Sequence, residues 1–250
     1  MHFHLPKPLH GWREFAGEVG IIVVGVLIAL GAEQVVESMN WKQRASHARD
    51  SLKTELGNHY EQAAEWRIVE PCIAAQLDRL QQRLLASGDR IDPAPVFHEE
   101  DRTYVFRAPS RPYPDSVWQG VVAEGVSSHF SDEDRLNLAI EYRQARDTDD
   151  LNKQITEAAA RLNSLSEPIP LDSSARLNLL QSLDEIRDDN RWVGIVAQQL
   201  IGYIDLVRMV PAMRQVRDYV AGSGTASFCR AQHLPLRPFS EATRPPAKFF

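Results

Sequence analysis

The sequence predicts an all-α protein in which one N-terminal transmembrane helix continues into a helical-bundle-like domain with one long irregular loop. The first observation is an apolar run over residues 15–36, where Glu18 and Glu33 are the only charged side chains. The second is that apolar residues recur at intervals of three and four along most of the remaining chain, as in amphipathic helices. The third is a cluster of five prolines within residues 89–115, which excludes a continuous helix there.

Composition places the chain among ordinary folded proteins. It has 250 residues, of which 43% are hydrophobic and 25% charged, and this is enough for a sizeable core. The net charge of −6 argues against nucleic acid, because phosphate binding needs a basic surface. We therefore expect no nucleic-acid partner.

Residues 15–36 have the length of a membrane span. Twenty-two helical residues rise about 33 Å, and the hydrocarbon core of a bilayer is about 30 Å thick. Trp12 and Trp41 are 29 residues apart, or about 43 Å along a helix, which is close to the separation of the two interfacial zones. We expect both to be interfacial anchors, with the lipid bilayer as a partner. Glu18 and Glu33 then lie near the hydrocarbon edges, where a carboxylate can reach water.

Two other interpretations of this run remain open. A cleaved signal peptide would use Val19 to Ala32 as its apolar region, although Glu14 and Glu18 stand where positive charge is usual. A buried soluble helix or strand is also compatible with the abundance of valine and isoleucine. The acids and the long preceding segment count against the signal peptide, and the flanking tryptophans count against the buried element, so the membrane span is favoured.

One face of the expected span carries small residues between two acids. At 100° per residue, the pair Gly25-x-x-x-Ala29 lies in the middle of this face, and small residues let helices approach closely in lipid. Glycine and alanine are also simply common in membrane helices. We expect the face to contact a second copy of the chain, giving a homo-oligomer, or another membrane protein. Its residues are Glu18, Ile22, Gly25, Ala29 and Glu33.

Two segments resemble a family of uncharacterised bacterial single-pass inner-membrane proteins. "GEVGIIVVGVLIALGAEQVVESMNW" (17–41) resembles the family's N-terminal segment, and "SVWQGVVAEGVSSHFSDEDRLNLAIEYRQ" (116–144) resembles a segment in the middle of its domain. The resemblance covers about a third of the chain. It implies an inner-membrane anchor and an extracytoplasmic helical domain, and it implies no activity. The matching residues are Gly17, Glu18, Gly25, Val26, Leu27, Ile28, Ala29, Leu30 and Trp41.

The two indicators of orientation disagree. Before the span lie Lys7, Arg13 and the amino terminus, whereas after it lie Lys42, Arg44, Arg49 and Lys53. This count favours a cytoplasmic C-terminal domain by the positive-inside rule. The resemblance implies a periplasmic domain. We follow the resemblance and expect a cytoplasmic N-terminus and a periplasmic domain in a bacterial inner membrane.

Four regions follow from these patterns. They are a short leader (1–14), the transmembrane helix (15–36), an all-α domain (37–222) and a proline-rich C-terminal tail (223–250). In the domain, an amphipathic seam over 41–66 and a new helix from Pro71 to Gly88 predict two helices broken at 67–71 and folded as an antiparallel hairpin.

The rest of the domain is expected to be helical after the irregular loop at about 89–115. Within that loop, "TYVFR" (103–107) is compatible with a short strand, but there is too little strand signal elsewhere for a sheet. Helix starts are expected at Asp115 or Ser116, at "SDED" (131–134), and at Asp172 or Ser173. The apolar stretch 192–210 is expected to be the central buried helix, kinked or restarted at Pro211. We expect the tail to be held only near Cys229.

The sequence contains no known catalytic, phosphate-binding or metal-binding motif, so we expect no catalytic residue, no cofactor and no metal. "HEEDR" (98–102) and "RDTDD" (146–150) are interpreted as solvated charge, and His59 and His129 have no evident partner. Cys72 and Cys229 are the only cysteines. A bridge between them would stabilise the fold by about 4–5 kcal/mol in an oxidising compartment, and two unpaired thiols are the alternative.

Three classes of function remain. The first is a membrane-anchored, non-enzymatic interaction or scaffolding protein. The second is an extracytoplasmic ligand-binding or sensory helical domain. The third is an enzyme with an unrecognised site. A pocket with converging polar groups beside residues 89–115 would favour the second or third class.

Overall fold

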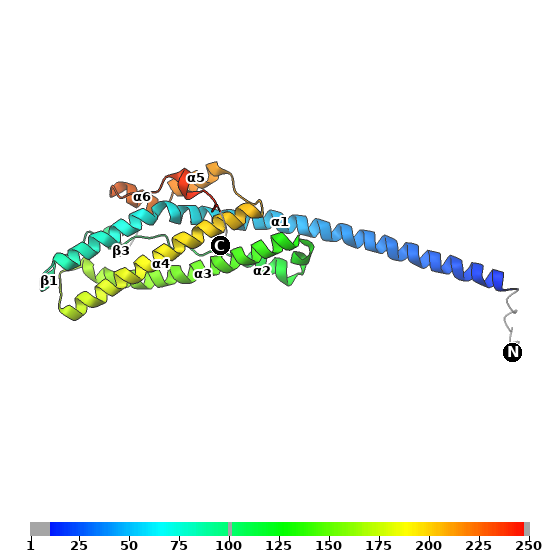
Figure 1. The fold of residues 1–250 in the computed structure, drawn as a ribbon, viewed down its shortest axis with the longest axis horizontal. Helices are drawn as coiled ribbons and strands as arrows, with labels where there is room; N and C mark the ends of the chain where they lie inside the picture. The colour runs from blue at the N-terminus through cyan, green and yellow to red at the C-terminus, as the bar shows by residue number, and fades with distance from the viewer. Residues whose placement is uncertain (1–10, 100–101, 248–250) are drawn as a thin grey trace.

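The computed structural model describes residues 11–99 and 102–247. The described chain is 76% helical and 3% strand, so the all-α prediction is confirmed. Three long helices make up most of it: α1 (Trp12–Ala86), α3 (Asp132–Leu162) and α4 (Ser173–Leu206). Figure 1 shows α4 lying between α1 and α3, with the first half of α1 projecting alone beyond the bundle.

The core forms along the second part of α1. Its large apolar residues from Leu52 to Leu84 are buried, and they meet the buried faces of α3 and α4. These positions follow the spacing of three and four that predicted the seam. The fully buried large apolar side chains of the three helices include Leu52, Leu56, Ile73, Leu77, Leu84, Leu138, Leu162 and Leu183.

The predicted helix break at 67–71 is wrong, because α1 continues through Pro71. Proline has no N–H for the carbonyl four residues earlier and tends to bend a helix. Figure 1 shows the axis of α1 changing direction in the cyan part of the ribbon, which contains Pro71. Buried neighbours on both sides (Val69 and Cys72) hold the helix across this point. The helix that packs back on α1 is α4, from much later in the chain.

Residues 89–115 contain no α-helix in their described part, but they are not one irregular loop. Strand β1 (Arg90–Ile91) pairs antiparallel with β4 (Ile169–Pro170), and β2 (Phe97–Glu99) pairs antiparallel with β3 (Arg102–Tyr104). The expectation that no sheet forms is therefore wrong, although each sheet has two short strands. Both β1 and the β2–β3 pair lie beside the far end of the bundle.

The shorter helices cover the bundle. They are α2 (Ser116–Ala123), α5 (Met213–Ala221), α6 (Gly224–Ala231), α7 (Phe239–Ala242) and the 3-10 turns η1 (Val126–His129) and η2 (Asn163–Ser166).

Two predicted helix starts are confirmed by hydrogen bonds. Ser131 Oγ accepts from Asp134 N (3.1 Å), and Asp172 Oδ1 accepts from Ala175 N (2.7 Å). The buried helix expected at 192–210 is the second half of α4, which already begins at Ser173 and ends at Leu206. Pro211 lies between α4 and α5, as a helix restart requires.

The tail is held along much of its length, contrary to the expectation that only the part near Cys229 is. Tyr60 Oη donates to Thr243 O (3.1 Å), and Arg67 Nη1 donates to Ala242 O (2.8 Å). Arg237 N donates to Ile68 O (2.9 Å), a carbonyl of α1 one turn before Cys72. Because both α6 and α7 contact α1, the tail is a layer of the domain.

Candidate functional site

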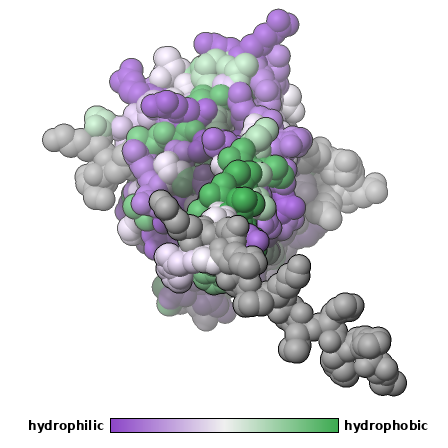
Figure 2. Space-filling view, turned by 90° about the vertical axis from the view of Figure 1, so that its right-hand side faces the viewer, coloured by the Kyte–Doolittle hydropathy of each residue, from purple (hydrophilic) through white to green (hydrophobic). Residues whose placement is uncertain are grey.

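Residues 15–36, in the projecting part of α1, expose apolar side chains around the helix and have no partner in the described chain. The twelve large apolar side chains between residues 15 and 36 are each at least 40% exposed. Figure 2 looks along the molecule from this end and shows the apolar segment in front of a mostly hydrophilic domain. Covering these side chains is worth on the order of 20 kcal/mol at 1.5–3 kcal/mol each. Part of α1 is therefore long and apolar enough to cross a membrane.

The small-residue face lies wholly on this projecting part. Glu18, Ile22, Gly25, Ala29 and Glu33 are all exposed, and a Cβ atom added at Gly25 would meet nothing within 4 Å. The face is therefore open to an outside partner. Trp12 at the start of α1 is 79% exposed, and its ring contacts Phe15 of the same helix, with centroids 5.9 Å apart.

Trp41 marks the point where α1 enters the domain. Its ring stacks on His129 of η1 with centroids 4.3 Å apart, and the Arg44 guanidinium lies 5.2 Å from the ring centre. A groove of about 780 Å³ opens at this junction. We call it the base groove, lined by Gln34, Glu37, Ser38, Trp41, Lys42, Ala45, Ser46, Arg49 and His129.

A buried glutamate of α1 caps a helix from another part of the chain. The Glu55 carboxylate accepts hydrogen bonds from Val117 N (3.0 Å) and Trp118 N (3.3 Å), two of the free N–H groups in the first turn of α2. Asp115, the residue at the cap position, makes no such bond. Tyr142 Oη also donates to Glu55, over 2.8 Å. Glu55 therefore joins α1, α2 and α3, and its charge is favourable at a helix N-terminus.

His59 lies one turn after Glu55 and is fully buried. Its Nε2 is 2.7 Å from Pro114 O, and because a carbonyl only accepts, this nitrogen carries a proton. Its Nδ1 is 2.8 Å from Glu141 Oε1 on α3. Burial works to lower the pKa of His59, but Glu141, with smaller contributions from Pro114 and Glu55, raises it above its usual value. Burial also raises the pKa of Glu141, and His59 only partly opposes this.

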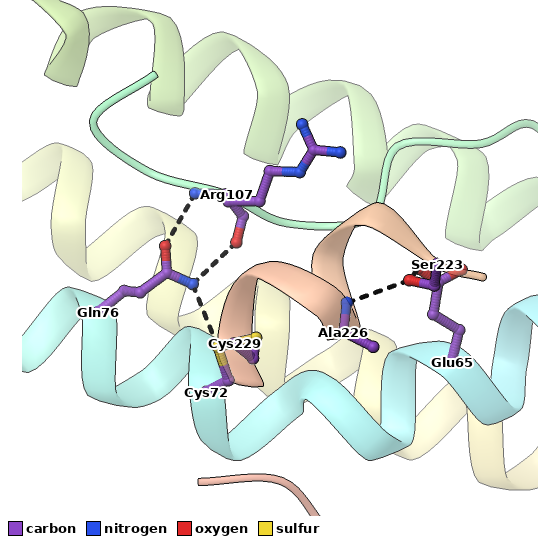
Figure 3. Close-up of a disulfide and its surroundings, with 7 residues drawn as sticks. All are labelled: Glu65, Cys72, Gln76, Arg107, Ser223, Ala226 and Cys229. Atoms are coloured by element: carbon purple, nitrogen blue, oxygen red, sulfur yellow. Dashed lines mark hydrogen bonds between the residues drawn. A yellow bond between two sulfur atoms is a disulfide. The ribbon is translucent and has the colours of Figure 1, made fainter. Parts of the chain in front are cut away.

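Cys72 and Cys229 are joined by a disulfide in the structure, with their Cα atoms 6.0 Å apart. Both residues are fully buried, so the bond fastens α6 to α1 from inside the core. Figure 3 shows Gln76 beside it, holding Arg107 by two backbone hydrogen bonds of 2.9 Å. The disulfide, α1 and the 89–115 segment therefore meet at one place.

A polar cleft of about 380 Å³ lies beside the 104–111 segment, and we call it the arginine cleft. Arg107 and Arg111 line one wall, and Thr156 on α3 and Thr225 on α6 line others. Figure 3 shows the Arg107 side chain pointing away from Gln76 and α1. Burial lowers the pKa of Arg107, while nearby Glu65 opposes this shift.

Glu65 supplies the acidic part of the arginine cleft. Its carboxylate accepts a hydrogen bond from Ser223 Oγ, which in turn accepts from Ala226 N at the start of α6 (3.1 Å). Arg111 Nη1 donates to Tyr219 Oη over 2.7 Å. Two guanidinium groups and one carboxylate therefore face the same space. This is a pocket with converging polar groups, of the kind that favours ligand binding or catalysis.

The other polar clusters singled out in the sequence, "HEEDR" and "RDTDD", offer fewer groups that could bind a ligand or catalyse a reaction. Among the described residues no group of three or more His, Cys, Asp or Glu is placed to hold a metal ion. Glu100 and Asp101 of "HEEDR" lie outside the described residues. In "RDTDD", Asp149 Oδ1 accepts from Tyr113 N (2.9 Å), so that residue anchors the 107–115 segment.

No protein-family model, curated protein or solved structure is significantly similar to this chain. Function is therefore inferred from the geometry of the described residues.

Sequence patterns did not indicate the buried polar residues of α1. His59 occupies a seam position, three residues after Leu56 and four before Ala63, where an apolar residue is expected. A histidine at an apolar seam position was the one local sign that a buried polar contact forms there. Its partners Glu141 and Pro114 are 82 and 55 residues away, so no local pattern connects them.

Proposed function

We propose that this chain is a membrane-anchored, non-enzymatic interaction or scaffolding protein. The observation that carries the proposal is the segment 15–36, which is exposed and apolar on every side while the rest of α1 is packed in a folded domain. A lipid bilayer covers such a helix on all sides, whereas a single protein partner covers one face. The small-residue face around Gly25 and Ala29 is then the surface that meets another helix.

We further propose that the domain is periplasmic, in a bacterial inner membrane. The disulfide between Cys72 and Cys229 supports this location, because disulfides persist in the periplasm and are rare in the cytosol. The resemblance of residues 17–41 to inner-membrane proteins with an extracytoplasmic domain points the same way. The count of Lys and Arg beside the span points to the opposite orientation, and the first span does not always decide topology.

Reporter fusions test this location. Alkaline phosphatase joined to the C-terminus is active only when exported, so the fusion in intact cells is expected to be active. A cytosolic reporter at the same position is expected to be inactive. The reverse result would place the domain in the cytoplasm. Recovery of both fusions in the soluble fraction would contradict the anchor itself.

The interaction role is tested by the mass of the full chain in mild detergent. Sedimentation is expected to give a homo-oligomer, or a complex with one stoichiometric membrane protein. A monomer at all concentrations, with no associated protein, would contradict a role in assembly.

The arginine cleft supports a second candidate, an extracytoplasmic ligand-binding domain. Arg107 and Arg111 are suited to a small ligand with carboxylate or phosphate groups. Thermal unfolding of the full chain in inorganic phosphate and in a short dicarboxylate tests this. A rise in Tm that is lost in Arg111→Gln but kept in the surface control Arg135→Gln supports binding. Equal Tm with and without either anion would argue against it.

A further inference from the structure

The base groove lies where α1 leaves the expected bilayer. Val36 ends the apolar segment, and Trp41 follows five residues later, about 7–8 Å along the helix. The headgroup layer on each side of a bilayer is of similar thickness, roughly 5–8 Å. Because α1 has no break between these residues, Trp41 and the adjoining rim of the groove are carried into this layer.

The groove is lined by groups that suit a phospholipid headgroup. Lys42 is exposed, and among the described residues its ammonium makes no hydrogen bond or ion pair. Arg44 does not line the groove but lies at its edge, against the Trp41 ring and on the same turn of α1. Arg49 Nη2 is already paired with Asp134 Oδ2 at 2.6 Å, so Lys42 and Arg44 are the cations that remain for a ligand. Glu37, the groove's acid, accepts from Trp41 Nε1 (3.4 Å).

The uneven distribution of charge along the chain also suits contact with an anionic lipid headgroup. The whole protein carries −6, yet residues 42–53 hold four cationic side chains and one acidic one. This basic stretch begins six residues after Val36, where the apolar segment ends. Juxtamembrane cations attract anionic lipids and lose this attraction within about a Debye length of the surface. The backbones of Lys42 and Arg44 are about 9 and 12 Å beyond Val36, which is just outside the headgroup layer and within about a Debye length of it.

We propose that the base groove binds the phosphate of an anionic phospholipid in the leaflet next to the domain. Lys42 receives the phosphate in the groove, Arg44 adds positive charge at its edge, and Trp41 stacked on His129 forms the apolar wall beside the glycerol backbone. This inference rests on the proposed membrane anchor, but it holds for either orientation of the domain, because both leaflets present headgroups.

Photoreactive lipids test the proposal on the full chain in vesicles. One probe is phosphatidylglycerol with a diazirine in its headgroup, and a second is phosphatidylcholine labelled in the same way. The labelled peptides are identified by mass spectrometry. We expect the phosphatidylglycerol probe to label residues 34–49 in preference to the phosphatidylcholine probe. Lys42→Gln should lower that labelling roughly fivefold, the effect of one cation near an anionic surface. Lys153→Gln, a surface change on α3, should not.

A third probe separates this proposal from the anchor. A lipid with its diazirine in the acyl chain should label residues 15–36 in the wild type and in both variants. Two results would show that the headgroup site is wrong while the anchor stands, provided that the acyl-chain probe labels residues 15–36. The first is equal labelling of residues 34–49 by the phosphatidylglycerol and phosphatidylcholine headgroup probes. The second is unchanged phosphatidylglycerol labelling in Lys42→Gln. Absence of acyl-chain labelling would overturn both.

Discussion

His59 Nδ1 on α1 lies 2.8 Å from Glu141 Oε1 on α3, and both side chains are almost fully buried. The other ring nitrogen of His59 donates to Pro114 O, so three segments meet at one imidazole. The pair holds a proton between two groups whose pKa values are both raised in the folded state. The folded chain therefore binds this proton more tightly than the unfolded chain does.

The first prediction is that stability falls as pH rises through the titration of this pair. The contribution of His59 is fully present below its unfolded pKa, about 6.5, and is lost as pH rises through its higher folded pKa. Glu141 acts in the same direction, since stability falls from its unfolded pKa of about 4.3 upward. One proton gives a slope of at most about 1.4 kcal/mol per pH unit. Urea unfolding between pH 5 and 9 measures it.

Glu141→Gln is the variant that isolates the pair. A glutamine amide can donate to His59 Nδ1 while His59 Nε2 still donates to Pro114 O, so the contact persists without a titrating carboxyl. The pH slope should become shallower in this variant and should be unchanged in the exposed control Glu133→Gln. Equal slopes in all three proteins would show that the pair does not govern the pH dependence.

The second prediction concerns Glu55, whose carboxylate caps α2 from α1. In Glu55→Gln the carboxamide keeps one acceptor oxygen but loses the charge and the second acceptor. At least one of Val117 N, Trp118 N and Tyr142 Oη is then left without its acceptor, which costs about 2 kcal/mol. Urea unfolding at neutral pH measures the loss, with Glu133→Gln again as control. A change below about 0.5 kcal/mol would mean that water or a neighbour replaces the carboxylate.

The third prediction concerns the disulfide between Cys72 and Cys229, which are 157 residues apart in sequence. The double variant Cys72→Ala/Cys229→Ala should lose about 4–5 kcal/mol of unfolding free energy, because the unfolded chain regains the entropy of a long loop. Limited proteolysis should cut the 223–247 region earlier than α3 and α4. Two free thiols in protein from its native membrane, measured by non-reducing mass spectrometry, would contradict the bond.

The fourth prediction concerns the small-residue face of the proposed span. Gly25→Leu with Ala29→Leu should weaken association of the full chain in membranes, because bulky side chains keep the helix backbones apart. The matched control is Gly20→Leu, about 140° around the helix from Gly25. Energy transfer between labelled copies, or the sedimenting mass in mild detergent, measures the difference. If the double variant and the control behave alike, this face is not the contact.

Sequence patterns predicted the helical class because helical spacing and cap residues are local signals. Ser131 and Asp172 are at the caps where they were expected. The break at Pro71 was predicted wrongly because a proline's cost of about 3 kcal/mol is local, whereas burial of the residues around it is a property of the whole fold. The strand β4 is only two residues long, so its pairing with β1 left no readable pattern.

The same distinction between local and long-range signals decides which site residues could be predicted from the sequence. The apolar segment and its small-residue face were evident because both are continuous on one helix. The arginine cleft was not, because Arg107, Glu65 and Thr225 come from three distant parts of the chain. Arg107 and Arg111 stand four residues apart in a proline-rich segment, and without a helix that spacing does not predict a shared face.

The uninterrupted passage of α1 from apolar segment to domain has a mechanical consequence. Fifty residues of α1 follow Val36, so with the proposed membrane anchor its far end lies roughly 75 Å along the helix from the bilayer boundary. Membrane helices commonly tilt by about 20° from the bilayer normal. With no hinge between span and domain, such a tilt sweeps the far end sideways by roughly 25 Å. A small change in lipid thickness or helix pairing would thereby produce a large displacement of the end of α1 at Ala86, which lies 14 residues beyond the disulfide at Cys72.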